Sequence, residues 1–233
     1  MLFSWMEHRV QKLLSNYGYC SRRKGERLIE DGRVRVNNRV ITIGDKATET
    51  DKIFVDNKLV NKEKKVYLMF NKPVGCVTAL TDKRYDTVMN FINIKQRVFP
   101  IGRLDYNTSG LLLLTNDGDF ANKVMHPSNE INKTYLTGVD RKIEDIDIKD
   151  MERGIDLEDG RTRPAKIRQL DATHMEITIH EGKNRIIRRM LKEIDFRVRF
   201  LKRVRIGQLN LADLKEGEFK HISENALKKV FLK

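Results

Sequence analysis

Residues 99–120 constrain the fold more than any other segment, and their sequence is FPIGRLDYNTSGLLLLTNDGDF. Residues 98–104 predict a short strand that one proline and one glycine interrupt. Residues 106–110 have the composition of a turn, and the apolar run at residues 111–114 predicts a buried strand. Asp105 therefore lies at the beginning of a turn between two core segments, where a side chain can be held rigidly and still be reached.

Asp105 has two interpretations. In the first, its carboxylate only caps the turn by accepting hydrogen bonds from backbone N–H groups, which is a common use of Asp in turns. The local pattern alone favours this structural interpretation. In the second, the carboxylate performs chemistry on a ligand, and the features that follow favour it.

The charge of the chain predicts the class of its partner. Its 233 residues include 46 Lys and Arg against 33 Asp and Glu, which gives a net charge of +13. A hydrophobic fraction of 39% is enough for the core of one large domain, or of one small and one medium domain. Because the basic residues are clustered, the charge indicates a polyanionic partner, with nucleic acid first and an anionic membrane second.

Cysteine usage and hydropathy bear on the compartment. Cys20 and Cys76 are far apart and lack C-x-x-C spacing, which predicts free thiols in a reducing compartment. The apolar residues 2–6 are too short for the core of a signal peptide, and no run approaches the ~20 apolar residues that span a bilayer. The sequence therefore predicts a soluble cytoplasmic protein that does not engage a membrane.

Residues 7–60 predict a compact basic module of two helices and a hairpin. Apolar residues fit one face of a helix at residues 10–14, and Ser21 is suited to cap a second helix. Residues 33–40 alternate with a period of two and turn at an Asn pair, which tolerates positive φ.

The sequence of residues 17–40, YGYCSRRKGERLIEDGRVRVNNRV, resembles the alpha-L RNA-binding module first seen in a small-subunit ribosomal protein. Asn38 stands where that family often has Gly, a departure that leaves the turn feasible. On charge alone, a solvated basic helix would be the alternative. The resemblance implies that the basic residues of the second helix and the hairpin contact RNA: Arg22, Arg23, Lys24, Arg33 and Arg35.

Residues 61–65 predict a short charged linker, and residues 66–233 a second domain. The expected strands are at residues 66–70, 131–136, 164–170 and 174–180, and the expected helices at residues 119–126, within the acidic stretch 140–159, from residue 184, and at residues 223–232. Lys72 and Lys83 lie at bends that either hold phosphates or are ordinary turns, and the pattern leaves both open.

A dense basic segment follows, with the sequence EGKNRIIRRMLK at residues 181–192. Residues 183–205 contain ten Lys and Arg and two acidic residues. A helix beginning at Asn184 would carry Arg185, Arg188 and Arg189 along one side.

The spacing of the potential metal ligands and nucleophiles excludes several kinds of chemistry. The five histidines lack metal-ligand spacing, and no G-x-S-x-G motif makes Ser109 a nucleophile. Hydrolysis of a phosphodiester would normally need metal ligands or a His pair. Chemistry at a nucleoside needs less: a carboxylate, a cation that keeps it ionised, and an aromatic side chain for a flipped base. The sequence therefore predicts a site without metal or cofactor.

Three motifs carry a resemblance to a known family. GRLDYNTSGLLLLTNDG at residues 102–118, KTY at residues 133–135 and EGKNRIIRRM at residues 181–190 resemble, in order, the motifs of ribosomal RNA pseudouridine synthases of the small-subunit type and their large-subunit relatives. The resemblance covers residues 8–231. It implies an α+β fold, with the small N-terminal module preceding a mixed, largely antiparallel sheet.

The resemblance also implies roles for site residues. Asp105 is implied to attack the target nucleotide, Tyr135 to stack on the flipped uracil, and Arg188 to pair with the aspartate. Arg103 is implied to help open the RNA around the target; the alternative is that Arg103 forms the pair and Arg188 binds phosphate. The further residues expected to bind RNA are Lys183, Arg185 and Arg189.

The function implied is the isomerisation of one uridine in ribosomal RNA, free or in a pre-ribosomal particle, by a monomer without a cofactor. The sequence MHPSNE at residues 125–130 favours the large subunit over the small subunit. The alternatives from other classes are a non-catalytic RNA-binding assembly factor and a DNA-binding protein.

Overall fold

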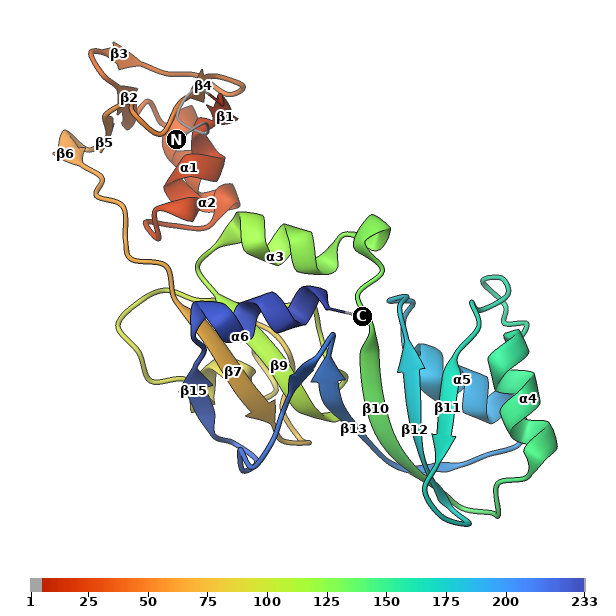
Figure 1. The fold of residues 1–233 in the computed structure, drawn as a ribbon. Helices are drawn as coiled ribbons and strands as arrows, with labels where there is room; N and C mark the ends of the chain where they lie inside the picture. Colours follow the sequence, from red (N-terminus) through yellow and green to blue (C-terminus); the bar gives the residue numbers. More distant parts are fainter. Residues whose placement is uncertain (1–5, 233) are drawn as a thin grey trace. The chain divides into compact units, whose positions relative to one another are not determined.

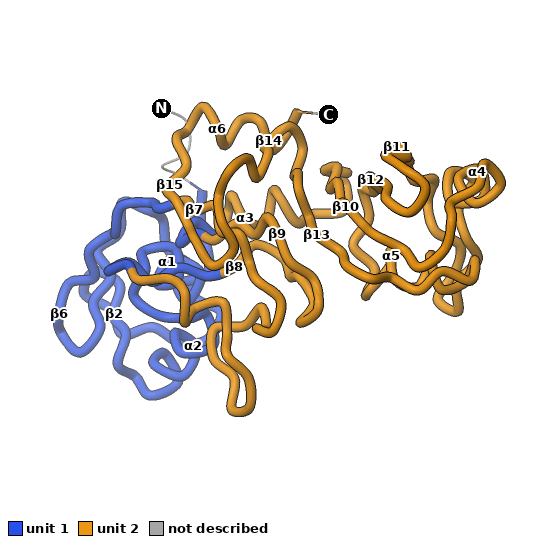
Figure 2. Tube along the Cα trace, turned by 90° about the horizontal axis from the view of Figure 1, so that it is seen from below, with its two compact units in different colours: residues 1–66, 94–99, 115–118 blue, residues 67–93, 100–114, 119–233 orange. Residues whose placement is uncertain are grey.

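The computed structural model describes residues 6–232 (Figure 1). All but one residue of the apolar segment 2–6 therefore lies outside the described residues. The chain divides into two compact units (Figure 2). The first comprises Met1–Val66, Ile94–Phe99 and Thr115–Gly118, and the second Tyr67–Asn93, Pro100–Leu114 and Asp119–Lys233.

The first unit contains the predicted two helices and hairpin. Its helices are α1 (Val10–Asn16) and α2 (Arg22–Glu30), and its strands are β1 (His8–Arg9), β2 (Val34–Val36), β3 (Arg39–Val40), β4 (Lys46–Ala47), β5 (Ile53–Val55) and β6 (Lys58–Leu59). As predicted, Ser21 caps α2, since its hydroxyl accepts a hydrogen bond from the Lys24 N–H at 3.2 Å. The hairpin turns at Asn37, whose φ is 53°. Strands β5 and β6 extend the hairpin into a four-stranded sheet of order β3-β2-β5-β6.

The charged residues predicted as a linker are bonded to residues 115–118. The Lys65 ammonium lies 2.7 Å from an Asp117 carboxylate oxygen. The Asn116 side chain accepts from the Val66 N–H at 2.8 Å and donates to the Lys64 carbonyl at 3.0 Å. The division into residues 7–60, 61–65 and 66–233 stays a prediction.

The second unit is built on a sheet of order β11-β12-β10-β13-β9-β7-β15, with β14 on β13 and β8 on β9. Its strands are β7 (Tyr67–Lys72), β8 (Phe99–Ile101), β9 (Ser109–Thr115), β10 (Lys133–Val139), β11 (Lys166–Gln169), β12 (His174–Ile179), β13 (Val198–Ile206), β14 (Leu209–Asn210) and β15 (Phe219–His221). Strand β10 is antiparallel to both β12 and β13, whereas β9 and β13 are parallel. The sheet is therefore mixed and largely antiparallel, which confirms the predicted α+β class.

The helices of this unit are α3 (Gly118–Met125), α4 (Asp145–Arg153), α5 (Ile186–Glu193) and α6 (Glu224–Lys228), with short 3-10 turns at Val88–Phe91, Pro127–Asn129 and Lys229–Phe231. Helix α4 is shorter than the acidic stretch, because a capping box at Glu144 begins it and Gly154, with φ of 90°, ends it. Helix α5 begins two residues after Asn184, because Arg185 has a left-handed φ of 47°.

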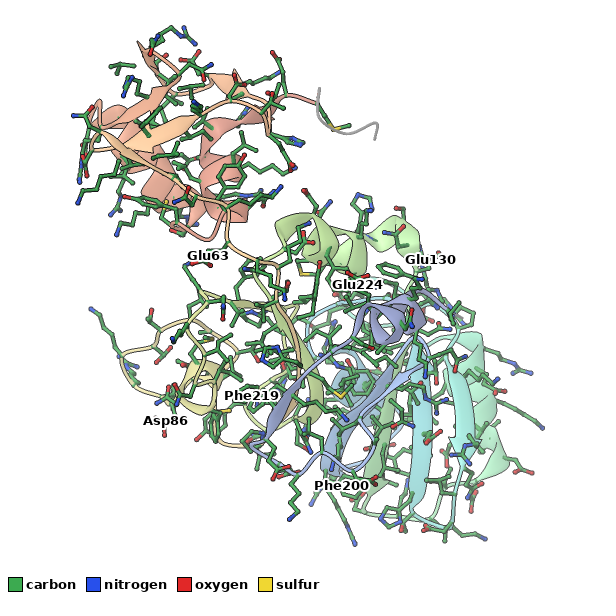
Figure 3. The ribbon with its side chains drawn as sticks, turned by 60° about the vertical axis from the view of Figure 1, so that its left-hand side comes forward. Glu63, Asp86, Glu130, Phe200, Phe219 and Glu224 are labelled. Atoms are coloured by element: carbon green, nitrogen blue, oxygen red, sulfur yellow. The ribbon has the colours of Figure 1, made fainter. Side chains whose placement is uncertain are left out.

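Strand β13 was not predicted, although it is the longest strand of the sheet. It runs from the basic segment through the labelled Phe200, while Phe219 marks β15 (Figure 3). Gly110 on β9 allows β13 to approach closely: its φ is +106°, and a Cβ there would collide with the Arg203 backbone. This close pairing places Arg203 beside Gly110 and Leu111 at the beginning of β9.

Candidate active site

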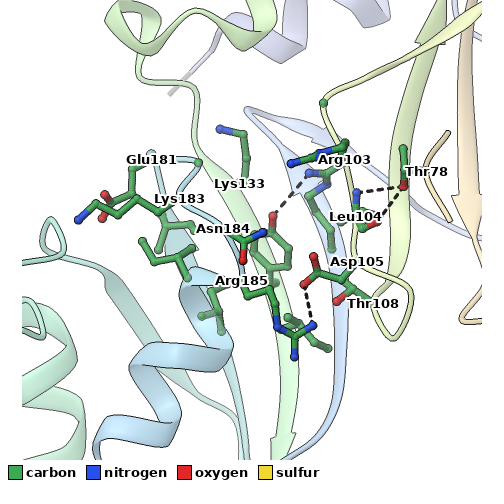
Figure 4. Close-up of a pocket in the computed structure, with 18 of the residues that line it drawn as sticks. Thr78, Arg103, Leu104, Asp105, Thr108, Lys133, Glu181, Lys183, Asn184 and Arg185 are labelled. Atoms are coloured by element: carbon green, nitrogen blue, oxygen red, sulfur yellow. Dashed lines mark hydrogen bonds and ion pairs between the residues drawn. The ribbon is translucent and has the colours of Figure 1, made fainter. Parts of the chain in front are cut away.

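A cavity of about 600 Å³ lies in the second unit. It is lined by the segment that leads into the turn at residues 105–108, by β10 and β13, and by the first residues of α5 (Figure 4). We call residues 105–108 the Asp105 turn. All three segments that carry the sequence motifs therefore line the cavity, and β13, which lies outside the motifs, lines it as well.

Asp105 presents its carboxylate to this cavity. The Thr108 N–H donates to the Asp105 carbonyl at 3.0 Å, which closes the turn. The carboxylate is 32% exposed, and its Oδ2 lies 3.7 Å from Nη1 of Arg185 (Figure 4). Among residues 6–232, no backbone N–H donates to this carboxylate. Turn capping is therefore excluded as its structural role.

The Asp105 turn is held from behind by two side chains. Thr78 Oγ1 donates to the Leu104 carbonyl at 2.8 Å and accepts from the Leu104 N–H at 3.2 Å. The ammonium of Lys72, which has no exposed surface, donates to the carbonyls of Asp105 at 3.1 Å and Thr108 at 3.0 Å, and also to that of Pro73. Burial lowers the pKa of Lys72. Of the two possibilities left open for Lys72, the structure therefore excludes a phosphate ligand.

Arg188 contacts the Asp105 turn differently from the expected ion pair. Its Nη2 donates to the Asn107 carbonyl at 2.6 Å, while its buried Nε has no hydrogen-bond partner. Among the described residues, the guanidinium within 4 Å of the Asp105 carboxylate belongs to Arg185. Burial and the charge of Arg185 lower the pKa of Arg188, and the charge of Asp105 raises it. The guanidiniums of Arg185 and Arg188 therefore both interact electrostatically with Asp105.

Tyr135 lies on β10 directly opposite Arg203 on β13. Arg203 Nε donates to the Leu111 carbonyl at 2.7 Å, and its Nη1 to the Tyr135 hydroxyl at 3.5 Å. Lys133 projects from the same face of β10 as Tyr135, since side chains two residues apart share a face. Burial and the charge of Arg203 lower the pKa of Lys133 to about 8. We call Lys133, Tyr135 and Arg203 the β10–β13 cluster.

The other predicted RNA-binding residues of this unit divide into two groups. Arg103 is exposed at the cavity, and Lys183 also lines it, although its ammonium donates to the Gly160 and Arg161 carbonyls. Arg189 does not line the cavity. Its guanidinium forms two hydrogen bonds to the Asp159 carboxylate, at 2.7 and 3.1 Å.

In the first unit, some of the residues predicted to bind RNA are exposed, whereas others have a partner within the protein. Three are exposed in the first turn of α2, namely Arg22, Arg23 and Lys24. Arg33 forms a two-point ion pair with Asp56, and the guanidinium of Arg35 lies 4.4 Å from the centre of the Phe54 ring.

Sequence reasoning gave no role to Lys133 or Arg203, and for Lys72 it left a phosphate ligand and an ordinary turn open without predicting an anchor for the Asp105 turn. Lys133 was noted only as part of the KTY motif. Arg203 was hidden among ten basic residues. Within the described part of the chain, no group of three or more His, Cys, Asp and Glu is placed to hold a metal ion. None of the helices in residues 6–232 is long and apolar enough to cross a membrane.

Comparisons with known proteins agree with this geometry. Residues 66–193 match the RNA pseudouridylate synthase family, and residues 8–53 match the S4 domain. The chain is 44% identical to ribosomal large subunit pseudouridine synthase B of Bacillus subtilis, over 95% of each chain. It is 37% identical to the dual-specificity RNA pseudouridine synthase RluF of Escherichia coli O6:H1, over 96% of this chain and 78% of the relative.

A solved pseudouridylate synthase structure superimposes with a TM-score of 0.72 at 30% identity, and covers 95% of this chain and 99% of that one. The matched regions contain the Asp105 turn, the β10 strand and helix α5, as well as the basic module at the N-terminus. The chain belongs to the RNA pseudouridine synthase family and carries an N-terminal S4 domain.

Proposed function

We propose that this protein converts a uridine of large-subunit ribosomal RNA to pseudouridine, with Asp105 as the catalytic carboxylate. The observation that carries the proposal is the convergence of Asp105, Tyr135 and Arg188 on one cavity. The similarity to ribosomal large subunit pseudouridine synthase B of Bacillus subtilis supports the choice of the large subunit. Small-subunit RNA is the second candidate substrate.

The reaction breaks the bond between N1 of uracil and C1′ of ribose and then joins C5 to C1′. It involves no net oxidation or reduction, so it requires no redox cofactor. Asp105 attacks the target nucleotide, with the guanidinium of Arg185 3.7 Å from its carboxylate and that of Arg188 bonded to the Asn107 carbonyl of the same turn. Tyr135 supplies an aromatic surface for the extruded base.

Both at the cavity and on α2, we expect exposed basic side chains to hold the RNA backbone. Arg103 at the cavity and Arg22, Arg23 and Lys24 on α2 are exposed and can contact phosphates. Phosphate contacts do not specify sequence, so these residues set affinity and register. Arg33, Arg35, Lys183 and Arg189 hold intramolecular partners and would contribute only if RNA displaced them.

We further propose that the protein acts in the cytoplasm as a monomer on ribosomal RNA or a pre-ribosomal particle. Size-exclusion chromatography with light scattering tests the monomer directly. Pull-down of the tagged protein identifies free RNA or a particle as its partner. A DNA-binding role predicts similar affinity for duplex DNA and rRNA fragments, which competition at fixed salt measures.

The decisive experiment maps pseudouridine in both ribosomal RNAs of cells that express the wild-type protein, the Asp105→Asn variant, or neither. We expect one large-subunit uridine to be modified only with the wild-type protein, while the variant still binds RNA. A pseudouridine that depends on the wild-type protein in small-subunit RNA would instead support the second candidate substrate. A variant that restores ribosome assembly without any pseudouridine would instead establish a non-catalytic assembly factor.

A further inference from the structure

The β10–β13 cluster contains two cations without a counterion, of which Arg203 is buried and Lys133 is half-buried. Arg203 is 3% exposed, and neither Arg203 nor Lys133 forms an ion pair with any described carboxylate. Their positive charges interact, since Arg203 lowers the pKa of Lys133. Unpaired buried charge is costly, so such a pair is expected where a ligand of opposite charge binds.

Both cations also have unused hydrogen-bond donors. The Lys133 ammonium has three N–H donors and makes one long bond, 3.3 Å to the Ile131 carbonyl. Nη2 of Arg203 is buried and has no partner. Both residues line the cavity, together with the apolar side chains of Ile179 and Ile206. A ligand with several acceptor atoms and a flat apolar ring would satisfy both the donors and the apolar walls.

We propose that Lys133 and Arg203 bind the carbonyl oxygens of uracil and stabilise the uracil anion formed when the glycosidic bond breaks. This inference rests on the proposed function. When the N1–C1′ bond breaks, its electron pair stays on the base, and the charge spreads over N1, O2 and O4. When C5 then forms its bond to C1′, the proton on C5 is lost, N1 gains a proton, and the anion is consumed.

The alternative ligand for these cations is a backbone phosphate. A phosphodiester carries a sugar on each side, whereas an extruded base enters as one flat ring, and the guanidinium of Arg203 lies 6.0 Å from the centre of the Tyr135 ring. The exposed Arg103 and Arg185 are better placed for the phosphates. The observations therefore favour the base.

The protonation of Lys133 gives the proposal a specific pH signature. Lys133 carries its charge below its pKa of about 8 and loses it above. The other ionisable groups that line the cavity are Arg103, Asp105, Tyr135, Glu181, Lys183, Arg185, Arg188 and Arg203. We expect the single-turnover rate of the wild-type protein to fall about fivefold between pH 8 and pH 9, as Lys133 becomes neutral.

The test measures tritium release from C5-labelled uridine in large-subunit rRNA transcribed in vitro, with enzyme in excess, between pH 6.5 and 9. For Lys133→Met we expect a rate about 100-fold lower and independent of pH, with the RNA dissociation constant changed less than about threefold. Lys133→Arg keeps the cation, so it should retain most of the activity and lose the decline above pH 8. The matched control is Lys166→Met, an exposed lysine on β11, which should behave as wild type.

Each other outcome is decisive. A Lys133→Met variant with weaker RNA binding and a normal rate at saturation would assign the cations to a phosphate. If Lys133→Met fails to fold, an unchanged decline above pH 8 in Lys133→Arg overturns the inference. An active wild type with an equally active Lys133→Met overturns the inference alone, whereas an inactive wild type overturns the proposed function and the inference with it.

Discussion

The Asp105 turn and the β10–β13 cluster face the same cavity, yet the backbone carbonyls of the turn are hydrogen-bonded whereas the cations of the cluster have donors to spare. At the turn, the carbonyls of Asp105 and Thr108 each accept from the buried Lys72 ammonium. In the cluster, Lys133 has one long hydrogen bond and Arg203 has a buried nitrogen without a partner. Satisfied polar atoms fix the position of a catalytic side chain, whereas unsatisfied atoms mark where a ligand completes the site. Variants can test whether one cation stabilises the turn while the others bind a ligand.

The largest contrast is expected between the buried Lys72 and the half-buried Lys133. Lys72→Met removes the ammonium that donates to three carbonyls and should lower the free energy of unfolding by about 3 kcal/mol. Lys133→Met removes a desolvated charge with one weak bond, so stability should change by less than about 1 kcal/mol or increase. Urea denaturation followed by circular dichroism measures both.

The contrast between the two lysines holds only if Lys72→Met and Lys133→Met differ in their free energy of unfolding. Equal losses of stability would show that Lys133 is as structural as Lys72, and would break the distinction between the turn and the cluster. A loss of activity at Lys72 in a variant of unchanged stability would give Lys72 a role in chemistry that its buried position argues against.

The two guanidiniums near Asp105 provide the next test. Arg188 combines a bond to the Asn107 carbonyl with a half-buried charge, whereas Arg185 is 48% exposed and its ion pair is screened by water. We expect Arg188→Gln to lower the single-turnover rate about 100-fold and Arg185→Gln about tenfold. RNA affinity, measured by filter binding, serves as the control. The reverse order would make the 3.7 Å contact the catalytic pair.

Much of the fold could be predicted because its signals are local. The apolar run of β9, the Ser21 cap of α2 and the Asn37 turn each follow from a few neighbouring residues. The position of Asp105 in a turn between two strands was predicted for the same reason. The beginning of α5 was displaced because the left-handed φ of Arg185 has no sequence signal in an arginine.

The parts that the sequence could not predict depend on pairing between distant residues. Arg203 meets Tyr135 only because β13 pairs with β10, and the alternating basic residues of β13 give no sign of which one is buried. Lys72 contacts the Asp105 turn across 33 residues of chain. The choice between Arg185 and Arg188 depends on side-chain geometry at the first turn of α5, which the motif does not contain.

A smaller effect is expected when the Tyr135 hydroxyl is removed. Tyr135→Phe keeps the ring, so base stacking and RNA affinity should remain, but Arg203 loses the acceptor for its Nη1. We expect a single-turnover rate about tenfold lower, which is ~1.4 kcal/mol in activation free energy. Tyr135→Ala is the comparison variant and should also weaken RNA binding about tenfold, because base–aromatic stacking is lost. A normal rate in Tyr135→Phe would show that Arg203 acts independently of the hydroxyl.

The smallest effect is expected at Thr78, which holds the residue before Asp105. Thr78→Val removes the hydroxyl that bonds both the N–H and the carbonyl of Leu104, and should lower stability by about 1–2 kcal/mol. Because Lys72 still holds the turn, the single-turnover rate should fall less than about fivefold. Thr78→Ser keeps the hydroxyl and should restore both values, as urea midpoints and rates would show. If Thr78→Val instead lowered the rate as much as Arg188→Gln, the bonds from Lys72 alone would not be enough to position Asp105, and the Thr78 bonds would be needed as well.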